Sequence, residues 1–143
     1  MGKELNDKER KKLSERFETF NSKDYSEEDI EKVLKKENKL KSLFSKKQLK
    51  EYADFFHDLM DMIKDYFNGN YKEIPWTAIA TAIGTMIYVF SPADLIPDVF
   101  PAIGLIDDAF IVGLCLTAIS VDVKKYKKWK ATQEDLNEEF KED

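Results

Sequence analysis

The stretch Tyr88-Val-Phe-Ser-Pro-Ala-Asp-Leu-Ile-Pro-Asp-Val-Phe-Pro-Ala-Ile-Gly-Leu-Ile-Asp-Asp108 is the centre of residues 74–122, the segment around which the fold is organised. These 49 residues contain no Lys, Arg, Glu or His, and their charges are Asp94, Asp98, Asp107, Asp108 and Asp122. Residues 1–73 carry 17 basic and 17 acidic side chains and residues 123–143 carry six of each, so the five aspartates account for the net charge of −5. An apolar, acidic centre between densely charged flanks predicts that residues 74–122 build the core.

The length and composition predict one globular domain. A chain of 143 residues is long enough for a single hydrophobic core. Its one cysteine, Cys115, lies in an apolar run, which excludes a cysteine-based zinc site or a disulfide framework within the chain. The first residues lack the apolar stretch of a secretory signal, so we expect a cytoplasmic protein. Acidity with mixed signs argues against nucleic acid as a partner, because phosphate binding needs a dominant basic face.

Helical periodicity runs through nearly the whole sequence. It predicts helices over residues 4–20, 26–44, 45–68, 76–90 and 108–130, followed by a short helix or tail from residue 132. Three pairs have the spacing of capping boxes at helix starts: Ser26 with Asp29, Ser45 with Gln48, and Thr132 with Asp135. In the last helix, Leu136 and Phe140 are expected to fold back on the body.

The predicted fold is all-α. We expect a single-domain helical bundle of five to six helices around a central apolar hairpin, formed by residues 76–90 and 108–130. Small residues recur along one side of the first of these helices, which lets a neighbouring helix approach closely. The predicted divisions of the chain are a charged N-terminal helix (1–25), a helical core domain (26–131) and a short C-terminal helix or tail (132–143).

The helix predicted over residues 45–68 carries the strongest amphipathic pattern in the chain. Met60 and Met62 widen its apolar stripe, and a core face is favoured over a groove for a partner. His57, the one histidine, lies beside this stripe without a second His or an arranged nucleophile. We therefore expect His57 to be an edge residue in contact with solvent and not a catalytic residue.

The central residues resemble the signature of the YkvA-like family, catalogued as domain of unknown function 1232. The resemblance rests on one Tyr, a Ser-Pro pair, further prolines, a glycine and aspartates at fixed spacing: Tyr88, Ser91, Pro92, Asp94, Pro97, Asp98, Pro101, Gly104, Asp107 and Asp108. It covers about residues 74–122. The resemblance implies a helical hairpin in a small bacterial protein or in a module of a larger chain, some of these being membrane proteins. It implies no reaction, because the family has no assigned activity.

Local structure explains much of this motif. Ser91 suits an N-cap with Pro92 at the first helical position, and Asp94 at the third position meets free backbone N–H groups. Asp107 or Asp108 can do the same for the next helix. The other members stiffen or turn the connection: Pro97, Pro101 and Gly104.

Two caps do not require the four carboxylates of Asp94, Asp98, Asp107 and Asp108, which lie within fifteen positions. We predict that they form an acidic binding surface at 91–108 for a basic protein partner, for which neutralising a toxin is one compatible role. Alternatively, these oxygens would bind Mg²⁺ or Ca²⁺ where two helix ends meet. No nucleophile, oxyanion donor or phosphate-binding glycine loop accompanies them, so the sequence favours a non-enzymatic protein without a cofactor.

A membrane-associated hairpin is the other alternative. Residues 74–93 are twenty residues without a charge, the length of a spanning helix. Five lysines that suit a membrane surface follow the second arm: Lys124, Lys125, Lys127, Lys128 and Lys130. That second arm, residues 109–121, spans about 20 Å as a helix against a hydrocarbon core of about 30 Å. The sequence therefore favours a core hairpin in a cytoplasmic interaction or regulatory protein.

Overall fold

The computed structural model describes residues 7–19, 25–46, 49–90 and 108–139. These residues form, in chain order, α1 (Asp7–Glu18), α2 (Glu27–Lys35), α3 (Glu37–Leu43), the 3-10 helix η2 (Lys50–Tyr52), α4 (Ala53–Phe67), α5 (Trp76–Phe90) and α7 (Asp108–Glu139). The described part of the chain contains no strand, and the predicted all-α class is confirmed.

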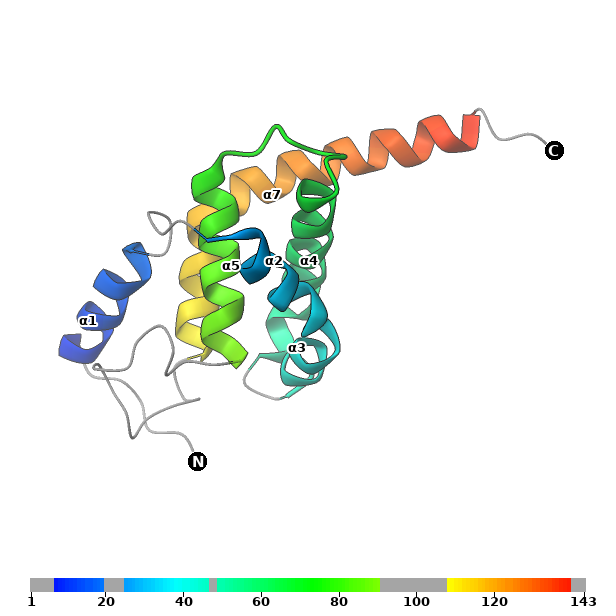
Figure 1. Ribbon diagram of the computed structural model, residues 1–143. Helices are drawn as coiled ribbons and strands as arrows, with labels where there is room; N and C mark the ends of the chain where they lie inside the picture. Colours follow the sequence, from blue (N-terminus) through cyan, green and yellow to red (C-terminus); the bar gives the residue numbers. More distant parts are fainter. Residues whose placement is uncertain (1–6, 20–24, 47–48, 91–107, 140–143) are drawn as a thin grey trace.

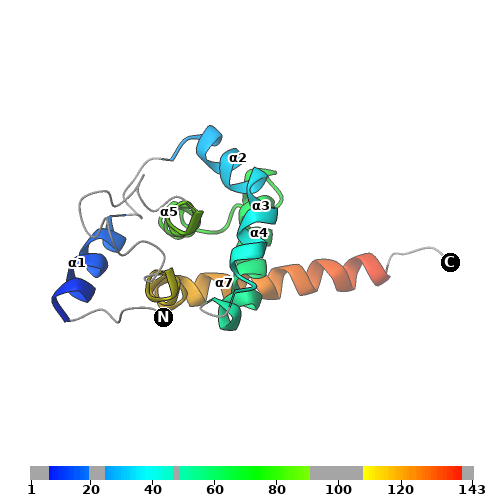
Figure 2. The same cartoon turned by 90° about the horizontal axis from the view of Figure 1, so that it is seen from below.

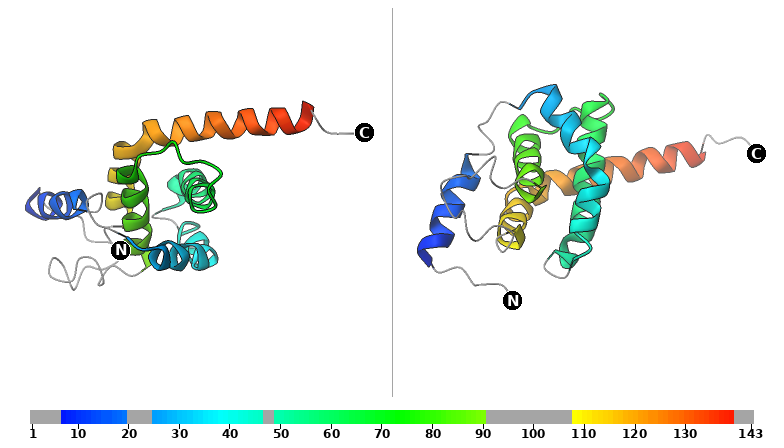
Figure 3. Two further views of the ribbon diagram at one scale, coloured as in Figure 1. Left: turned by 45° about the horizontal axis from the view of Figure 1, so that its top comes forward. Right: turned by 60° about the horizontal axis from the view of Figure 1, so that its bottom comes forward.

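The central hairpin consists of α5 and the first half of α7, which run antiparallel and side by side (Figure 1). Helices α2, α3 and α4 cover one side of this hairpin. Helix α1 lies on the opposite side, as Figures 2 and 3 show from other directions. The predicted bundle around an apolar helical hairpin is therefore confirmed, with six α-helices among the described residues.

Helix α5 is the buried centre of the fold. Residues 78–89 are all buried, because the helix is apolar around its whole circumference and has neighbours on every side. Two threonines in this run are satisfied within the helix. The Thr81 hydroxyl donates to the carbonyl oxygen of Thr77 at 2.7 Å, and the Thr85 hydroxyl donates to that of Thr81 at 2.8 Å. Their burial therefore leaves no hydroxyl without a partner.

Helix α4 places its apolar stripe in the same core. Met60 and Met62 are both fully buried, which confirms the prediction that they belong to the core. Phe56 stacks on Phe44, with ring centroids 4.6 Å apart, and thereby joins α4 to the end of α3. His57 is exposed on the edge of α4, as its position beside the stripe predicts.

The capping boxes have different outcomes. At the start of α2, the Ser26 hydroxyl accepts from the backbone N–H of Asp29 at 3.2 Å and the Asp29 carboxylate accepts from that of Ser26 at 2.9 Å. This predicted box is confirmed. The helix start predicted at Ser45 is wrong, because the Ser45 hydroxyl donates to the carbonyl oxygen of Ser42 at 2.6 Å and completes the preceding turn instead. Gln48, the other member of this predicted box, lies outside the described residues. Helix α4 begins later, at Ala53, after η2.

The single helix predicted over residues 26–44 is two helices. Lys36, with φ −93° and ψ 11°, ends α2, and α3 begins at Glu37 in a new direction. Val33 of α2 and Leu40 of α3 are nevertheless both fully buried. Glu37 itself forms an ion pair with Lys64 of α4, with Nζ and Oε1 2.7 Å apart. Glu37, which interrupts the apolar face of residues 26–44, therefore marks the position where the helix changes direction.

The separate helix expected from residue 132 is also wrong, because α7 continues to Glu139. No Gly or Pro follows Gly113 in α7, so nothing in the sequence stops the helix. The Thr132 hydroxyl donates to the carbonyl oxygen of Lys128 inside the helix and caps nothing. Leu136 is 40% exposed and does not fold back on the body, and Phe140 lies outside the described residues. The regular backbone of α7 breaks once, at Ile119, with φ −122° and ψ 16°.

Alkaline pH is expected to destabilise the fold. Burial raises the pKa of the Cys115 thiol from 9.0 to about 12, although a hydrogen bond with Thr85 opposes this rise. Burial, with a smaller effect of Asp29, raises the pKa of Tyr25 to about 12. The folded state holds the protons of Cys115 and Tyr25 more tightly than the unfolded state does. The stability that these two protonated groups give to the fold is therefore complete below pH 9 and is lost progressively towards pH 12. Melting temperatures measured from pH 8 upward should therefore fall.

The Cys115→Ala variant provides the control for this expectation. It should melt lower at pH 8, because a buried side chain is shortened, yet lose less between pH 9 and pH 10 than the parent. Parallel pH profiles for the two proteins would contradict the assignment of this pH dependence to Cys115.

Candidate functional site

Most of the predicted acidic site lies outside the described residues. This applies to Asp94, Asp98 and Asp107, and to the motif residues Ser91, Pro92, Pro97, Pro101 and Gly104. Asp108 is the first residue of α7, and Tyr88 is buried in α5 with 3% of its surface exposed. The ends of α5 and α7 that border this segment lie next to each other (Figure 1). The acidic binding surface and the cation site at 91–108 stay predictions.

The lysine-rich half of α7 is positioned by acidic residues of α4. The Lys127 ammonium group lies 3.4 Å from a carboxylate oxygen of Asp58, and that of Lys130 lies 3.0 Å from one of Asp61. Further along the same face of α4, Asp65 accepts a hydrogen bond from the hydroxyl of Tyr126 in α7. Three aspartates at spacings of three and four thus face α7, as expected for one side of a helix.

An aromatic cluster secures this contact. The ring of Tyr126 lies 5.4 Å from that of Tyr71 and 5.9 Å from that of Trp129, measured between centroids. Tyr71 and Trp129 are themselves 4.8 Å apart. Burial, the hydrogen bond to Asp65 and the charges of the α4 aspartates all raise the pKa of Tyr126, so its hydroxyl stays protonated and donates to the carboxylate. The direction of α7 after Ile119 is therefore fixed by packing and charge together.

The other three predicted lysines are exposed. Lys124, Lys125 and Lys128 form no ion pair with any residue that the structure describes. They project from the side of α7 roughly opposite Val123 and Tyr126, which are buried against the body. The fold thus separates a run of five similar lysines into two that bind α4 and three that face solvent.

Large apolar side chains are also exposed on α7. Val121 is 63% exposed and Leu116 is 36% exposed, both on α7. Val121 precedes Lys124 and Lys125 by one helical turn, so an apolar contact and cationic groups lie on neighbouring positions of the same helix. We call Val121, Lys124, Lys125 and Lys128 the α7 basic face.

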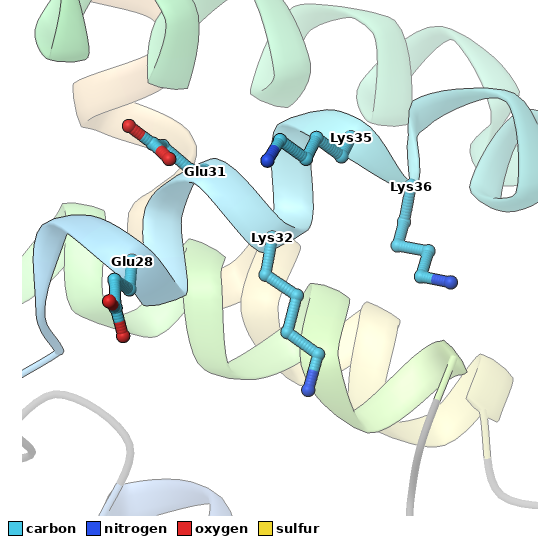
Figure 4. Close-up of a pocket in the computed structure, with 5 residues that line it drawn as sticks. All are labelled: Glu28, Glu31, Lys32, Lys35 and Lys36. Carbon is cyan, nitrogen blue, oxygen red and sulfur yellow. The ribbon is translucent and has the colours of Figure 1, made fainter.

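Two of the hollows on the described surface lie away from the α7 basic face. One, of about 280 Å³, lies between α1 and the hairpin and is lined by Ser14, Phe17, Glu18, Thr81, Leu114, Thr117 and Ala118. The other lies on α2, where Lys32, Lys35 and Lys36 point in different directions (Figure 4). Their ammonium groups do not converge, so this hollow is not a cradle for an anion.

The described residues offer no metal centre and no spanning helix. In residues 7–19, 25–46, 49–90 and 108–139, no three His, Cys, Asp or Glu side chains are grouped to hold a metal ion. Asp58, Asp61 and Asp65 instead contact Lys127, Lys130 and Tyr126. No helix in this part of the chain combines the length and the apolar character needed to cross a membrane.

Comparison with known proteins identifies the class of the hairpin. A family model described as a protein of unknown function, DUF1232, matches residues 78–114, which run from α5 into the first half of α7. The chain is also 30% identical over 90 residues to the uncharacterized membrane protein YkvA of Bacillus subtilis strain 168, an alignment that covers 63% of this chain and 85% of that protein. No solved structure matches.

The chain belongs to the YkvA-like family that is defined by the DUF1232 domain. The resemblance inferred from the spacing of the central motif is confirmed. What the sequence reasoning missed is the role of Asp58, Asp61 and Asp65. Their spacing of three and four along one side of α4 is the signal in the sequence of a charged contact face, and it does not identify the partner helix.

Proposed function

We propose that this protein binds the surface of anionic membranes through the α7 basic face and has no catalytic role. The observation that carries the proposal is the exposure of Lys124, Lys125 and Lys128 on a helix whose direction is fixed by α4. A lysine near an anionic bilayer contributes about 1 kcal/mol of binding. Because the helix is already ordered, little conformational entropy would be lost when these side chains meet lipid headgroups.

The geometry suits contact with a surface more than insertion. Val121 is exposed beside these lysines and would add apolar contact at the level of the headgroups. By contrast, the apolar side chains of α5 are committed to the protein core. The Bacillus subtilis relative is called a membrane protein, and a peripheral mode of binding is compatible with that name without requiring a spanning helix.

Sedimentation with vesicles tests the proposal. The protein should bind vesicles of phosphatidylcholine containing about one third phosphatidylserine, and added salt should weaken binding. Replacing Lys124, Lys125 and Lys128 together by alanine should lower the affinity roughly 100-fold, from about 1 kcal/mol per lysine. The fold should be unchanged, because none of the three is buried.

A matched control is available on α2. Replacing the exposed Lys32, Lys35 and Lys36 by alanine removes the same charge from another surface, and this variant should keep nearly full vesicle affinity. Equal losses in the two variants would indicate attraction by overall charge and contradict a specific α7 basic face. Absence of sedimentation with anionic vesicles would reject the proposal outright.

The functional role inferred from the acidic connection is a separate prediction. The described residues do not test four further predictions: a basic protein partner at 91–108, a cation at the same place, a cytoplasmic location and the absence of enzymatic activity. Membrane-surface binding does not depend on any of them, because the α7 basic face lies on the other half of α7.

A further inference from the structure

The last part of α7 extends beyond the body of the protein. Residues 131–138 are all exposed, and the helix projects past α4 into solvent (Figures 1 and 3). An isolated helical segment of this length gains little stability in water, since most helical stability in proteins comes from packing. The projecting segment is therefore a surface that another molecule would stabilise.

One side of this segment has a regular pattern. Lys124, Lys128, Ala131, Asp135 and Glu138 follow each other at spacings of four, three, four and three. Successive residues of an α-helix lie about 100° apart, so these five fall within an arc of about 80°. All five are exposed. We call them the α7 stripe, and it lies roughly 130° around the helix from the residues that face α4.

The α7 stripe is complementary to itself when reversed. If a second copy of α7 runs antiparallel with Ala131 at the crossing point, Lys124 lies opposite Glu138 and Lys128 lies opposite Asp135. Two-fold symmetry makes each of these ion pairs occur twice. Ala131 has the smallest side chain of the stripe and permits close approach of the two helices. A parallel arrangement would instead place like charges opposite each other, which is unfavourable.

We propose that the α7 stripe is a docking surface for a second copy of this chain, bound antiparallel through Lys124, Lys128, Asp135 and Glu138. The proposal goes beyond membrane binding and opposes it, because Lys124 and Lys128 serve both. A pair of chains would hold these lysines against carboxylates, and an anionic bilayer would release them. The acidic residues of the stripe take part in the pairing alone.

Cysteine cross-linking tests the register. With diamide as oxidant, Ala131→Cys should give a disulfide-linked dimer, because the symmetry axis brings the two copies of this position together. The native Cys115 is fully buried and will not compete. Asn137→Cys is the matched control, since this position is equally exposed but lies about 18 Å from its symmetry mate in the proposed pair. Equal cross-linking rates for the two variants would overturn the proposal.

Charge reversal tests the complementarity in the Ala131→Cys background. The variant with Lys124→Glu and Lys128→Glu should cross-link roughly tenfold more slowly, and so should the variant with Asp135→Lys and Glu138→Lys. Mixing the two variants, one carrying a size tag, should restore cross-linking as a mixed dimer. Loss in both single preparations without recovery in the mixture would overturn the antiparallel register.

The same variants separate this proposal from the proposed function. Asp135→Lys with Glu138→Lys retains every lysine of the α7 basic face, so it should bind anionic vesicles at least as well as the parent. Failure of vesicle binding in the parent chain would reject membrane association and leave the cross-linking result standing. Failure of cross-linking would reject the pairing and leave vesicle binding standing.

Discussion

Replacing Ile83 by alanine is expected to lower the free energy of unfolding by about 2–5 kcal/mol. Ile83 is fully buried in the middle of α5, with neighbours on every side of the helix. The loss combines the transfer free energy of the removed methyl and methylene groups with the cost of a cavity that the close-packed core fills incompletely. Urea denaturation followed by circular dichroism would measure the change.

The exposed Val121 of α7 provides the control. Val121→Ala also shortens a branched apolar side chain in a helix, but its side chain is 63% exposed, so the change in unfolding free energy should stay within about 0.5 kcal/mol. A cost at Ile83 no larger than that at Val121 would contradict the packing of α5 as the core of the fold. It would also reopen the alternative in which the hairpin faces lipid.

Replacing Tyr126 by alanine is expected to cost about 3–5 kcal/mol, as for other large aromatic residues in a core. Tyr126 is 1% exposed and is among the largest fully buried side chains of the described chain. Its removal would also separate the rings of Tyr71 and Trp129 from their common neighbour. The fluorescence of Trp129 should shift accordingly, which reports on the attachment of α7 to α4.

The Tyr126→Phe variant isolates the hydroxyl. It keeps the ring contacts and removes the donor to Asp65, a hydrogen bond to a charged group with a typical worth of about 1.5–3 kcal/mol. Asp65 is half-buried and water can replace part of this bond, so we expect the lower end of that range. If the phenylalanine and alanine variants are equally unstable, ring packing contributes little and the proposed role of the aromatic cluster is wrong.

Helix positions followed from the sequence where residue types gave a helix a clear start or end. The α5 helix and the Ser26 cap were predicted in this way, and so was the end of α4 before Gly69, whose φ of 83° suits a residue without a side chain. Two of the errors, at Ser45 and Thr132, arose where a polar residue had two possible partners. Ser45 has the spacing of a cap, but its hydroxyl bonds to the Ser42 carbonyl in the turn that ends α3.

The candidate sites divide in the same way. The YkvA-like motif was recognised from residue types and spacing, since Ser-Pro, proline, glycine and aspartate each restrict the local backbone. The separation of the lysines was not predictable from spacing within 124–130 alone. Lys127 and Lys128 are adjacent and chemically identical, yet one binds Asp58 and the other faces solvent because the helix turns by about 100° between them.

The sequence by itself determined the all-α class, the apolar hairpin of α5 and α7, and membership of the YkvA-like family, because these depend on periodicity and on short-range backbone preferences. The tertiary structure alone decided which lysines are free, where α7 changes direction and how far it projects. Those features depend on contacts between residues about 60 to 70 positions apart, such as Tyr126 with Asp65 and Lys130 with Asp61. Local sequence preferences carry no information about such pairs until the helices have packed.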